Sequence, residues 1–192
     1  LGYQAAVFSF DRPPLNMLKH KHMRVIYTTN EKIKLLARRG IDIYIEHPFT
    51  DEFSHLSPED FVIKVLLEKT GMKVLVVGDD CGFGYKRQGN VELLERMSKE
   101  YDFKLIVIPK LVLEGEIVSS TRIRHLLSEG KVEEANRLME DPFMICGPVV
   151  HGNHMGAEVL QMPTANQIPL EDKLLPPNGV YVSRIHYKDE TY

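Results

Sequence analysis

The sequence has few of the features that mark secreted, membrane-spanning or nucleic-acid-binding proteins. Its only cysteines are Cys81 and Cys146, too few for a disulfide framework, so we expect a reducing, cytoplasmic location. No apolar run approaches the ~18 residues of a membrane span, and we expect no signal peptide. Lysines and arginines number 24 against 27 acidic residues, for a net charge of -3. That balance gives no basis for bulk nucleic-acid binding, so we expect any bound anion to be held by local residues.

Apolar strands and amphipathic helices alternate from the start of the chain to about residue 140. Strands are predicted at 5–10, 41–45, 73–77 and 105–109. Helices are predicted to begin after the N-caps Thr28 and Ser57, and to span 91–100, 119–127 and 132–139. The apolar run at 73–77 does not alternate, which is typical of a parallel strand that is covered on both faces. This order predicts an α/β fold with a doubly wound parallel sheet.

The composition changes after Asp141 and Pro142, where glycine, proline and β-branched residues begin to dominate. Strands are expected at 144–151 and 179–185, and no helical pattern remains. We therefore predict a domain boundary near residue 141. An α/β domain would occupy 1–141, and the start of a β-rich module would occupy 142–192.

A glycine-rich segment, 78–89, follows a predicted strand at its carboxyl end, where open α/β sheets bind their ligands. Its four glycines permit close backbone approach and left-handed φ angles, so amide groups can surround an anion. Lys86 and Arg87 add positive charge, and Asp79 and Asp80 could bind Mg²⁺ or a ribose. An ordinary long turn would have the same composition, so the pattern alone leaves both interpretations open.

The second candidate is the start of the helix at 119–127. Three hydroxyl residues, Ser119, Ser120 and Thr121, precede Arg122 and Arg124. Arginine conflicts with the positive end of the helix dipole, which favours acidic residues. A bound phosphate resolves the conflict, because N-terminal amides, hydroxyls and guanidinium groups all favour an anion. The alternative is a serine N-cap followed by solvated arginines.

A third and weaker candidate lies in the β-rich module. Thr164 and Asn166 offer hydroxyl and amide oxygens, which Mg²⁺ accepts as ligands. Gly152 and Gly156 permit the close approach of a phosphate. Taken alone, these residues describe a hairpin followed by a loop.

Taken together, these segments resemble the prokaryotic bifunctional riboflavin kinase/FAD synthetase family. The similar segments occur in the family's order and are 9–14, 77–84, 118–124, 163–166 and 178–181. The resemblance implies a Rossmann-like nucleotidyltransferase domain that joins FMN and ATP into FAD and releases pyrophosphate. It also implies a β-barrel flavokinase domain that phosphorylates riboflavin with ATP and Mg²⁺.

The resemblance also implies roles for individual residues. Those expected to hold the ATP phosphates during catalysis are Ser119, Ser120, Thr121 and Arg124. Those expected to line the nucleotide or flavin sites are Asp80, Phe83, Gly84, Arg87, Gly152, Gly156, Asn178 and Tyr181. Thr164 and Asn166 would bind the Mg²⁺–nucleotide in the kinase module.

The chain departs from the family pattern in several places. The family's N-terminal histidine segment and its C-terminal kinase carboxylate have no counterpart here, so we expect both domains to be incomplete. Cys81 stands where the family has phenylalanine, and the loop at 156–163 is one residue longer. Two alternatives therefore stay open. One is another small-molecule adenylyltransferase, such as a pantetheine-phosphate adenylyltransferase, and the other is a non-catalytic flavin- or nucleotide-binding protein.

Overall fold

A computed structural model describes residues 2–14, 23–150, 165–187 and 190–191 of the chain. The chain divides into two compact units, Leu1–Val118 and Ser119–Tyr192, which are described separately below.

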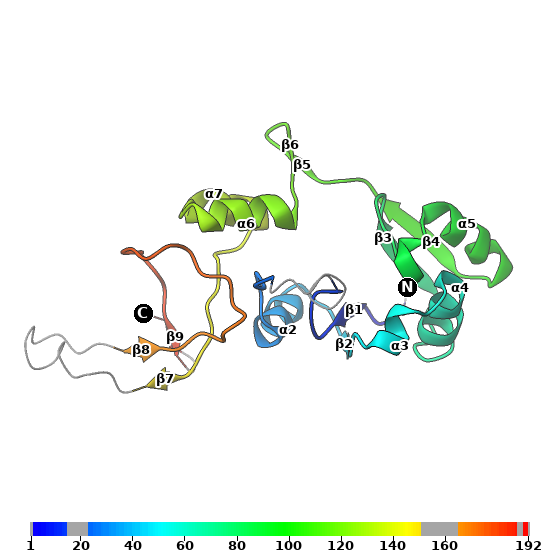
Figure 1. Cartoon of the computed structure of the whole chain (residues 1–192), viewed down its shortest axis with the longest axis horizontal. Coiled ribbons are helices and arrows are strands. Elements are labelled where there is room, and N and C mark those ends of the chain that lie inside the picture. The colour runs from blue at the N-terminus through cyan, green and yellow to red at the C-terminus, as the bar shows by residue number, and fades with distance from the viewer. Residues whose placement is uncertain (1, 15–22, 151–164, 188–189, 192) are drawn as a thin grey trace, which may run out of the picture. The chain divides into compact units, whose positions relative to one another are not determined.

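The first unit contains two parallel strand pairs. Strand β1 (Ala6–Phe10) pairs with β2 (Ile43–His47), and β3 (Val74–Gly78) pairs with β4 (Lys104–Ile108). Figure 1 shows β3 and β4 side by side. The prediction of parallel strands alternating with helices is confirmed. Among the described residues, however, the two pairs form separate two-stranded sheets, so a single doubly wound sheet is not observed.

Two helices of this unit begin after their predicted N-caps, Thr28 and Ser57. Helix α2 (Thr29–Arg38) starts after Thr28, whose hydroxyl accepts the Glu31 N–H while the Glu31 carboxylate accepts the Thr28 N–H. Helix α3 (Asp51–Ser54) is short, and α4 (Pro58–Asp60) starts after the N-cap Ser57. Helix α4 continues directly into the π-helical segment η1 (Phe61–Leu67), and α5 spans Val91–Glu100 as predicted.

The core of the first unit lies between η1, α5 and the β3–β4 pair. Val62 of η1, Leu94 and Met97 of α5, and Phe103 are all buried there. Leu94 and Met97 are three residues apart, so they lie on the same face of their helix. The other face of the strand pair is open, because Val76 is about half exposed. The expectation that this sheet is covered on both faces is therefore wrong for the described residues.

A small hairpin ends the first unit. Strands β5 (Val112–Leu113) and β6 (Glu116–Ile117) are antiparallel and joined by Glu114 and Gly115. Both turn residues have left-handed φ angles, 53° and 79°. Two left-handed residues are typical of the tight turn that suits the twist of a hairpin.

The second unit begins with two packed helices, α6 (Ser120–Ser128) and α7 (Val132–Met139). Leu127 of α6 and Ala135 of α7 are fully buried. Two short antiparallel pairs follow. Strand β7 (Val149–Val150) pairs with β8 (Asn166–Gln167), and β9 (His186–Tyr187) pairs with β10 (Glu190–Thr191).

Two strand predictions in the second unit need correction. Residues 179–185 form no strand, and the side chains of Val180 and Val182 are fully exposed. Of the strand expected at 144–151, only Val149–Val150 is observed among the described residues. Val149–Val150 pairs with β8, whereas no strand pairs with 179–185 within the described part of the chain, and a strand requires such pairing for its backbone groups. A closed barrel is therefore not observed in that part.

Candidate functional site

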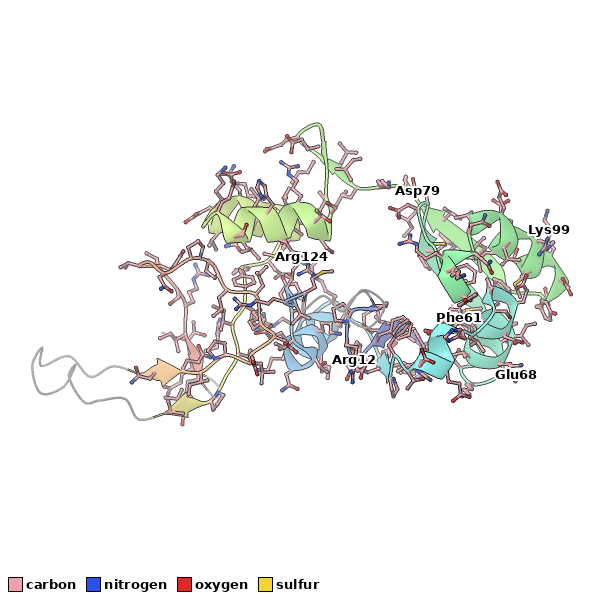
Figure 2. All side chains as sticks on the ribbon, in the orientation of Figure 1. Arg12, Phe61, Glu68, Asp79, Lys99 and Arg124 are labelled. Carbon is pink, nitrogen blue, oxygen red and sulfur yellow. The ribbon has the colours of Figure 1, made fainter. Side chains whose placement is uncertain are left out.

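The glycine-rich segment forms a compact loop at the carboxyl end of β3. Its start stays paired to the sheet, since the Asp79 N–H donates to the Ile108 carbonyl at 3.0 Å. Figure 2 places Asp79 just beyond the end of β3. Farther along, Phe83 and Gly89 exchange two backbone hydrogen bonds, of 3.2 and 2.9 Å. The loop thus folds back on itself, and η2 (Tyr85–Arg87) lies at its turn.

Gly84 docks this loop onto the start of α4. Its φ angle is +69°, and a β-carbon there would lie 2.6 Å from Pro58 Cα. The next residue continues the contact, because the Tyr85 N–H donates to the Leu56 carbonyl at 2.8 Å. The Tyr85 ring also stacks on the His55 ring, with centroids 5.1 Å apart. Only glycine satisfies both the backbone angle and the close approach at position 84.

A small apolar cavity of about 110 Å³ lies against the inner side of the loop. It is lined by Phe61, Val62, Leu66, Leu75, Val77, Cys81, Gly82, Phe83 and Leu94. The Phe83 ring lies 5.9 Å from the Phe61 ring and fills the space in front of Gly89. The predicted site residue Phe83 is therefore held by the core on one side and by the loop on the other.

The polar groups of the loop lie at the carboxyl ends of β3 and β4. Asp80 forms an ion pair with Lys110, in which the carboxylate oxygen and Nζ are 3.3 Å apart. Lys110 was missed at the sequence level. Lys110 follows the end of β4. The carboxyl ends of adjacent parallel strands lie side by side, so a parallel pairing of β3 with β4 would have indicated that Lys110 lies near the loop. Burial and the nearby Asp80 carboxylate raise the pKa of the Cys81 thiol, whereas Arg87 lowers it.

The four predicted residues of this loop, Asp80, Phe83, Gly84 and Arg87, are thus gathered in one folded segment. Three residues of the loop have left-handed φ angles. They are Gly84, Lys86 and Arg87, and the angles of Lys86 and Arg87 are 51° and 59°. Non-glycine residues adopt such angles at a cost of roughly 1–3 kcal/mol, and such strain is concentrated at functional sites. The loop holds the Arg87 side chain exposed to solvent.

A second group of residues lies at the carboxyl end of the β1–β2 pair. The Asp11 carboxylate accepts the Phe49 N–H at 3.0 Å and both Nε and an amino group of Arg12. Partial burial alone would raise the pKa of Asp11, but the hydrogen bonds from Phe49 and Arg12 outweigh it and lower that pKa. Asp11 therefore joins the loop after β1 to the loop after β2.

The start of α6 carries the second predicted constellation. Ser119 is the N-cap, and its hydroxyl accepts the Arg122 N–H at 3.2 Å. Ser120 and Thr121 are exposed in the first turn. Arg124 extends from α6 in Figure 2 and is partly buried, which lowers the pKa of its guanidinium. Hydroxyls, helix amides and a guanidinium thus lie within one turn and a half, a donor set that suits a phosphate.

The residues predicted in the β-rich module are only partly described. Gly152, Gly156 and Thr164 lie outside the described residues. Asn166 is exposed on β8, opposite Val150 of β7. Asn178 is exposed, and the Tyr181 hydroxyl donates to the Pro177 carbonyl at 2.8 Å.

Lys173, which sequence reasoning missed, is the most buried charged residue described in this unit. Its ammonium group donates to the Met144 carbonyl and lies 4.3 Å from the centre of the Phe143 ring. This side chain therefore fixes the segment that follows α7 to the loop at 170–173. A lysine is rarely buried, but no local sequence pattern marks this one.

Three further findings bear on function. Among the described residues, no group of three or more histidine, cysteine, aspartate or glutamate side chains could hold a metal ion. Neither Cys81 nor Cys146 forms a disulfide. No helix in the described part of the chain is long and apolar enough to cross a membrane.

Comparisons with known proteins match both parts of the chain. The family model described as FAD synthetase matches residues 1–122, and the one described as riboflavin kinase matches residues 139–192. A bifunctional riboflavin kinase/FMN adenylyltransferase of Buchnera aphidicola subsp. Schizaphis graminum is 40% identical over 92% of this chain and 56% of its own length. The protein of that name from Listeria monocytogenes is 34% identical over 100% of this chain and 60% of its own.

A solved structure is also similar. The crystal structure of a macrolide-efflux protein from Streptococcus pneumoniae has a TM-score of 0.81 and 29% sequence identity. The match covers 98% of this chain and 61% of that one. This chain spans somewhat more than half the length of the curated relatives it matches.

Proposed function

Because the chain belongs to the FAD synthetase family, we propose that the protein containing it transfers the adenylyl group of ATP to FMN, yielding FAD and pyrophosphate. The observation that carries this proposal is the order of the two family matches, FAD synthetase first and riboflavin kinase second, on one chain. The riboflavin kinase match supports a second activity, the phosphorylation of riboflavin by ATP to give FMN. The substrates are small molecules, and we place both reactions in the cytoplasm.

The proposed domains follow from the same matches. We assign 1–141 to a Rossmann-like adenylyltransferase domain and 142–192 to the first part of a β-barrel kinase domain. The riboflavin kinase match begins at residue 139, close to this boundary, and the parallel strands that support the first assignment lie within 1–141. The two compact units of the structure divide earlier, between Val118 and Ser119.

In the proposed adenylyl transfer, an oxygen of the FMN phosphate attacks the α-phosphorus of ATP. The new phosphorus–oxygen bond forms as the bond to the β-phosphate bridge breaks, and pyrophosphate leaves with the bonding electrons. Such a reaction needs little covalent help from the protein, so orientation and charge stabilisation supply most of the rate enhancement.

We assign the main catalytic contact with the ATP phosphates to Arg124, with the hydroxyls of Ser119, Ser120 and Thr121 as orienting donors. Partial burial of Arg124 supports this role, because a guanidinium withdrawn from water interacts more strongly with a phosphate. The exposed first-turn hydroxyls and the helix amides can donate to the same anion.

We assign a nucleotide- or flavin-lining role to the loop residues Asp80, Phe83, Gly84 and Arg87. Their support is the folded loop at the carboxyl end of β3, which presents Arg87 to solvent and carries the Phe83 ring on its inner side. Loops in this position are where open α/β sheets bind ligands.

In the kinase module, we propose that Thr164 and Asn166 hold Mg²⁺ with the nucleotide, and that Gly152, Gly156, Asn178 and Tyr181 line the ATP or flavin site. The exposed amide of Asn166 is an oxygen ligand of the type that Mg²⁺ accepts. When bound, Mg²⁺ would neutralise charge on the phosphates.

The test uses the full-length protein with FMN, ATP and Mg²⁺, followed by chromatographic separation of the flavins. We expect FAD and pyrophosphate to form in equal amounts. Absence of FAD with every divalent metal tried would refute the adenylyltransferase function. Tight binding of FMN or ATP without turnover would instead support the non-catalytic alternative.

A further inference from the structure

A glycine inside the loop, Gly82, lies directly against the side chain of Arg87. A β-carbon at Gly82 would lie 2.7 Å from Arg87 Nε, 2.8 Å from one of its amino nitrogens and 3.1 Å from Cζ. Real β-carbons do not approach other atoms so closely. The guanidinium plane therefore occupies the space that any other residue at position 82 would fill.

The backbone of the loop directs Arg87 toward this contact. Arg87 has a left-handed φ angle of 59°, and its N–H donates to the Gly84 carbonyl at 3.0 Å. The paired backbone groups of Phe83 and Gly89 close the loop on either side. The position of the Arg87 Cα is thus fixed. Because Gly82 has no side chain, the guanidinium of Arg87 can lie against the backbone at position 82.

The guanidinium remains available for an external anion. Asp80, the carboxylate of the loop that is nearest to Arg87 in sequence, is paired with Lys110 instead. Arg87 forms no ion pair with any other residue that the structure describes. Arg87 is exposed to solvent, and its guanidinium lies beside the position of the missing Gly82 β-carbon.

We propose that Gly82 is a positioning residue, whose missing β-carbon holds the guanidinium of Arg87 against the loop and aims it at a phosphate of ATP. The proposal rests on the proposed function, because it deepens the role of Arg87 in the adenylyltransferase site. It also makes position 82 a determinant of ATP affinity although Gly82 itself offers no side chain to the substrate.

The variant Gly82→Ala tests this contact cleanly. Gly82 does not have a left-handed backbone, and the atoms that an added methyl group meets belong to the far end of a flexible side chain. The fold should therefore survive while the guanidinium moves away. At Gly89, in contrast, a β-carbon would strike the Phe83 ring at 2.7 Å, so alanine there would disturb the core. Urea unfolding of Gly82→Ala should match that of the parent.

The kinetic experiment measures FAD formation by the full-length protein with ATP varied at saturating FMN, and then with FMN varied at saturating ATP. Gly82→Ala should raise the KM of ATP roughly tenfold, about the effect of losing one hydrogen bond to a charged group, with little change in kcat. An unchanged KM of ATP, or a rise confined to the KM of FMN, would overturn the assignment to ATP.

A double-mutant cycle tests whether Gly82 affects ATP binding through Arg87. Arg87→Ala should raise the KM of ATP at least as much as Gly82→Ala, and adding Gly82→Ala to Arg87→Ala should have no further effect. If Gly82→Ala raised the KM by the same factor in both backgrounds, Gly82 would act independently of Arg87 and the proposal would be wrong.

A substrate-free measurement distinguishes this proposal from the proposed function. In a Cys146→Ser background, the pH dependence of Cys81 alkylation reports the thiol pKa, which Arg87 lowers. Gly82→Ala should raise that pKa as the guanidinium moves away. An unchanged thiol pKa would overturn the positioning of Arg87 whatever the activity. A raised thiol pKa with an unchanged KM of ATP would instead overturn the role of Arg87 in ATP binding.

Discussion

Replacement of Gly84 by alanine should destabilise the first unit more than the same change at Gly71. The two glycines have nearly equal left-handed φ angles, +69° and +65°. A β-carbon at Gly84 would lie 2.6 Å from Pro58 Cα and 2.7 Å from Pro58 N, whereas one at Gly71 would meet nothing within 4 Å. The pair therefore separates the contact with Pro58 from the cost of the backbone angle.

The expected loss of unfolding free energy has two contributions, the left-handed backbone angle and the contact with Pro58. A left-handed conformation costs a non-glycine residue roughly 1–2 kcal/mol, which applies to both variants. Overpacking against a backbone that cannot move aside costs roughly a further 1–3 kcal/mol, which applies only to Gly84→Ala. We expect the free energy of unfolding to fall by about 1–2 kcal/mol for Gly71→Ala and by about 2–5 kcal/mol for Gly84→Ala.

The assay is urea unfolding of the full-length protein and both variants, followed by far-ultraviolet circular dichroism. For a domain of 150–250 residues each kcal/mol corresponds to about 2–4 °C in Tm, so thermal unfolding gives an independent check. Equal losses of stability in the two variants would refute the reasoning, because the loop would then not be docked on Pro58.

Three other changes have defined outcomes. Arg124→Ala should lower kcat/KM for FAD formation by the equivalent of roughly 2–4 kcal/mol, and Arg122→Ala by less, since Arg124 is the arginine to which we assign the contact with the ATP phosphates. Equal, mild losses would contradict the assignment. Asp11→Asn should lower the unfolding free energy at pH 7. The lowered pKa of Asp11 means that its ionised form stabilises the fold above about pH 4, so the difference should shrink as the pH falls further. A difference that does not vary with pH would argue against this. Thr28→Ala should lower the free energy of unfolding, measured in urea, by about 1 kcal/mol, because the N-cap hydrogen bond is removed. An unchanged free energy of unfolding would mean that the cap does not form in solution.

Local signals in the sequence predict much of the first unit. The caps at Thr28 and Ser57 and the helix at Val91–Glu100 are found where composition places them, because each depends on contacts within four residues. The alternation of strands and helices is likewise correct. How the strands combine into sheets depends on contacts between distant segments, and there the prediction of one doubly wound sheet was not met in the described residues.

The errors in the second unit have the same physical origin. The apolar residues at 179–185 have the composition of a strand, yet Val180 and Val182 are fully exposed. Strand formation depends on a pairing partner, and composition does not reveal whether one is present.

The candidate site was predicted as a set of segments rather than as contacts. The sequence identifies Asp80 and Arg87 as charged residues of a glycine-rich loop. It does not indicate that Lys110 pairs with Asp80 or that Arg87 rests on Gly82, because both contacts depend on how the loop folds. The sequence also suggests that glycines would supply the left-handed angles, whereas Lys86 and Arg87 adopt two of them.

The most direct test of the central claim is to follow the phosphorus atoms of ATP. The full-length protein is incubated with FMN, Mg²⁺ and ATP labelled at either the α- or the γ-phosphorus, and the flavins are then separated. Adenylyl transfer predicts label in FAD from the α-position only, with the γ-label recovered in pyrophosphate. Absence of α-label from the flavin fraction, or entry of γ-label into a product of FMN, would contradict the proposed reaction.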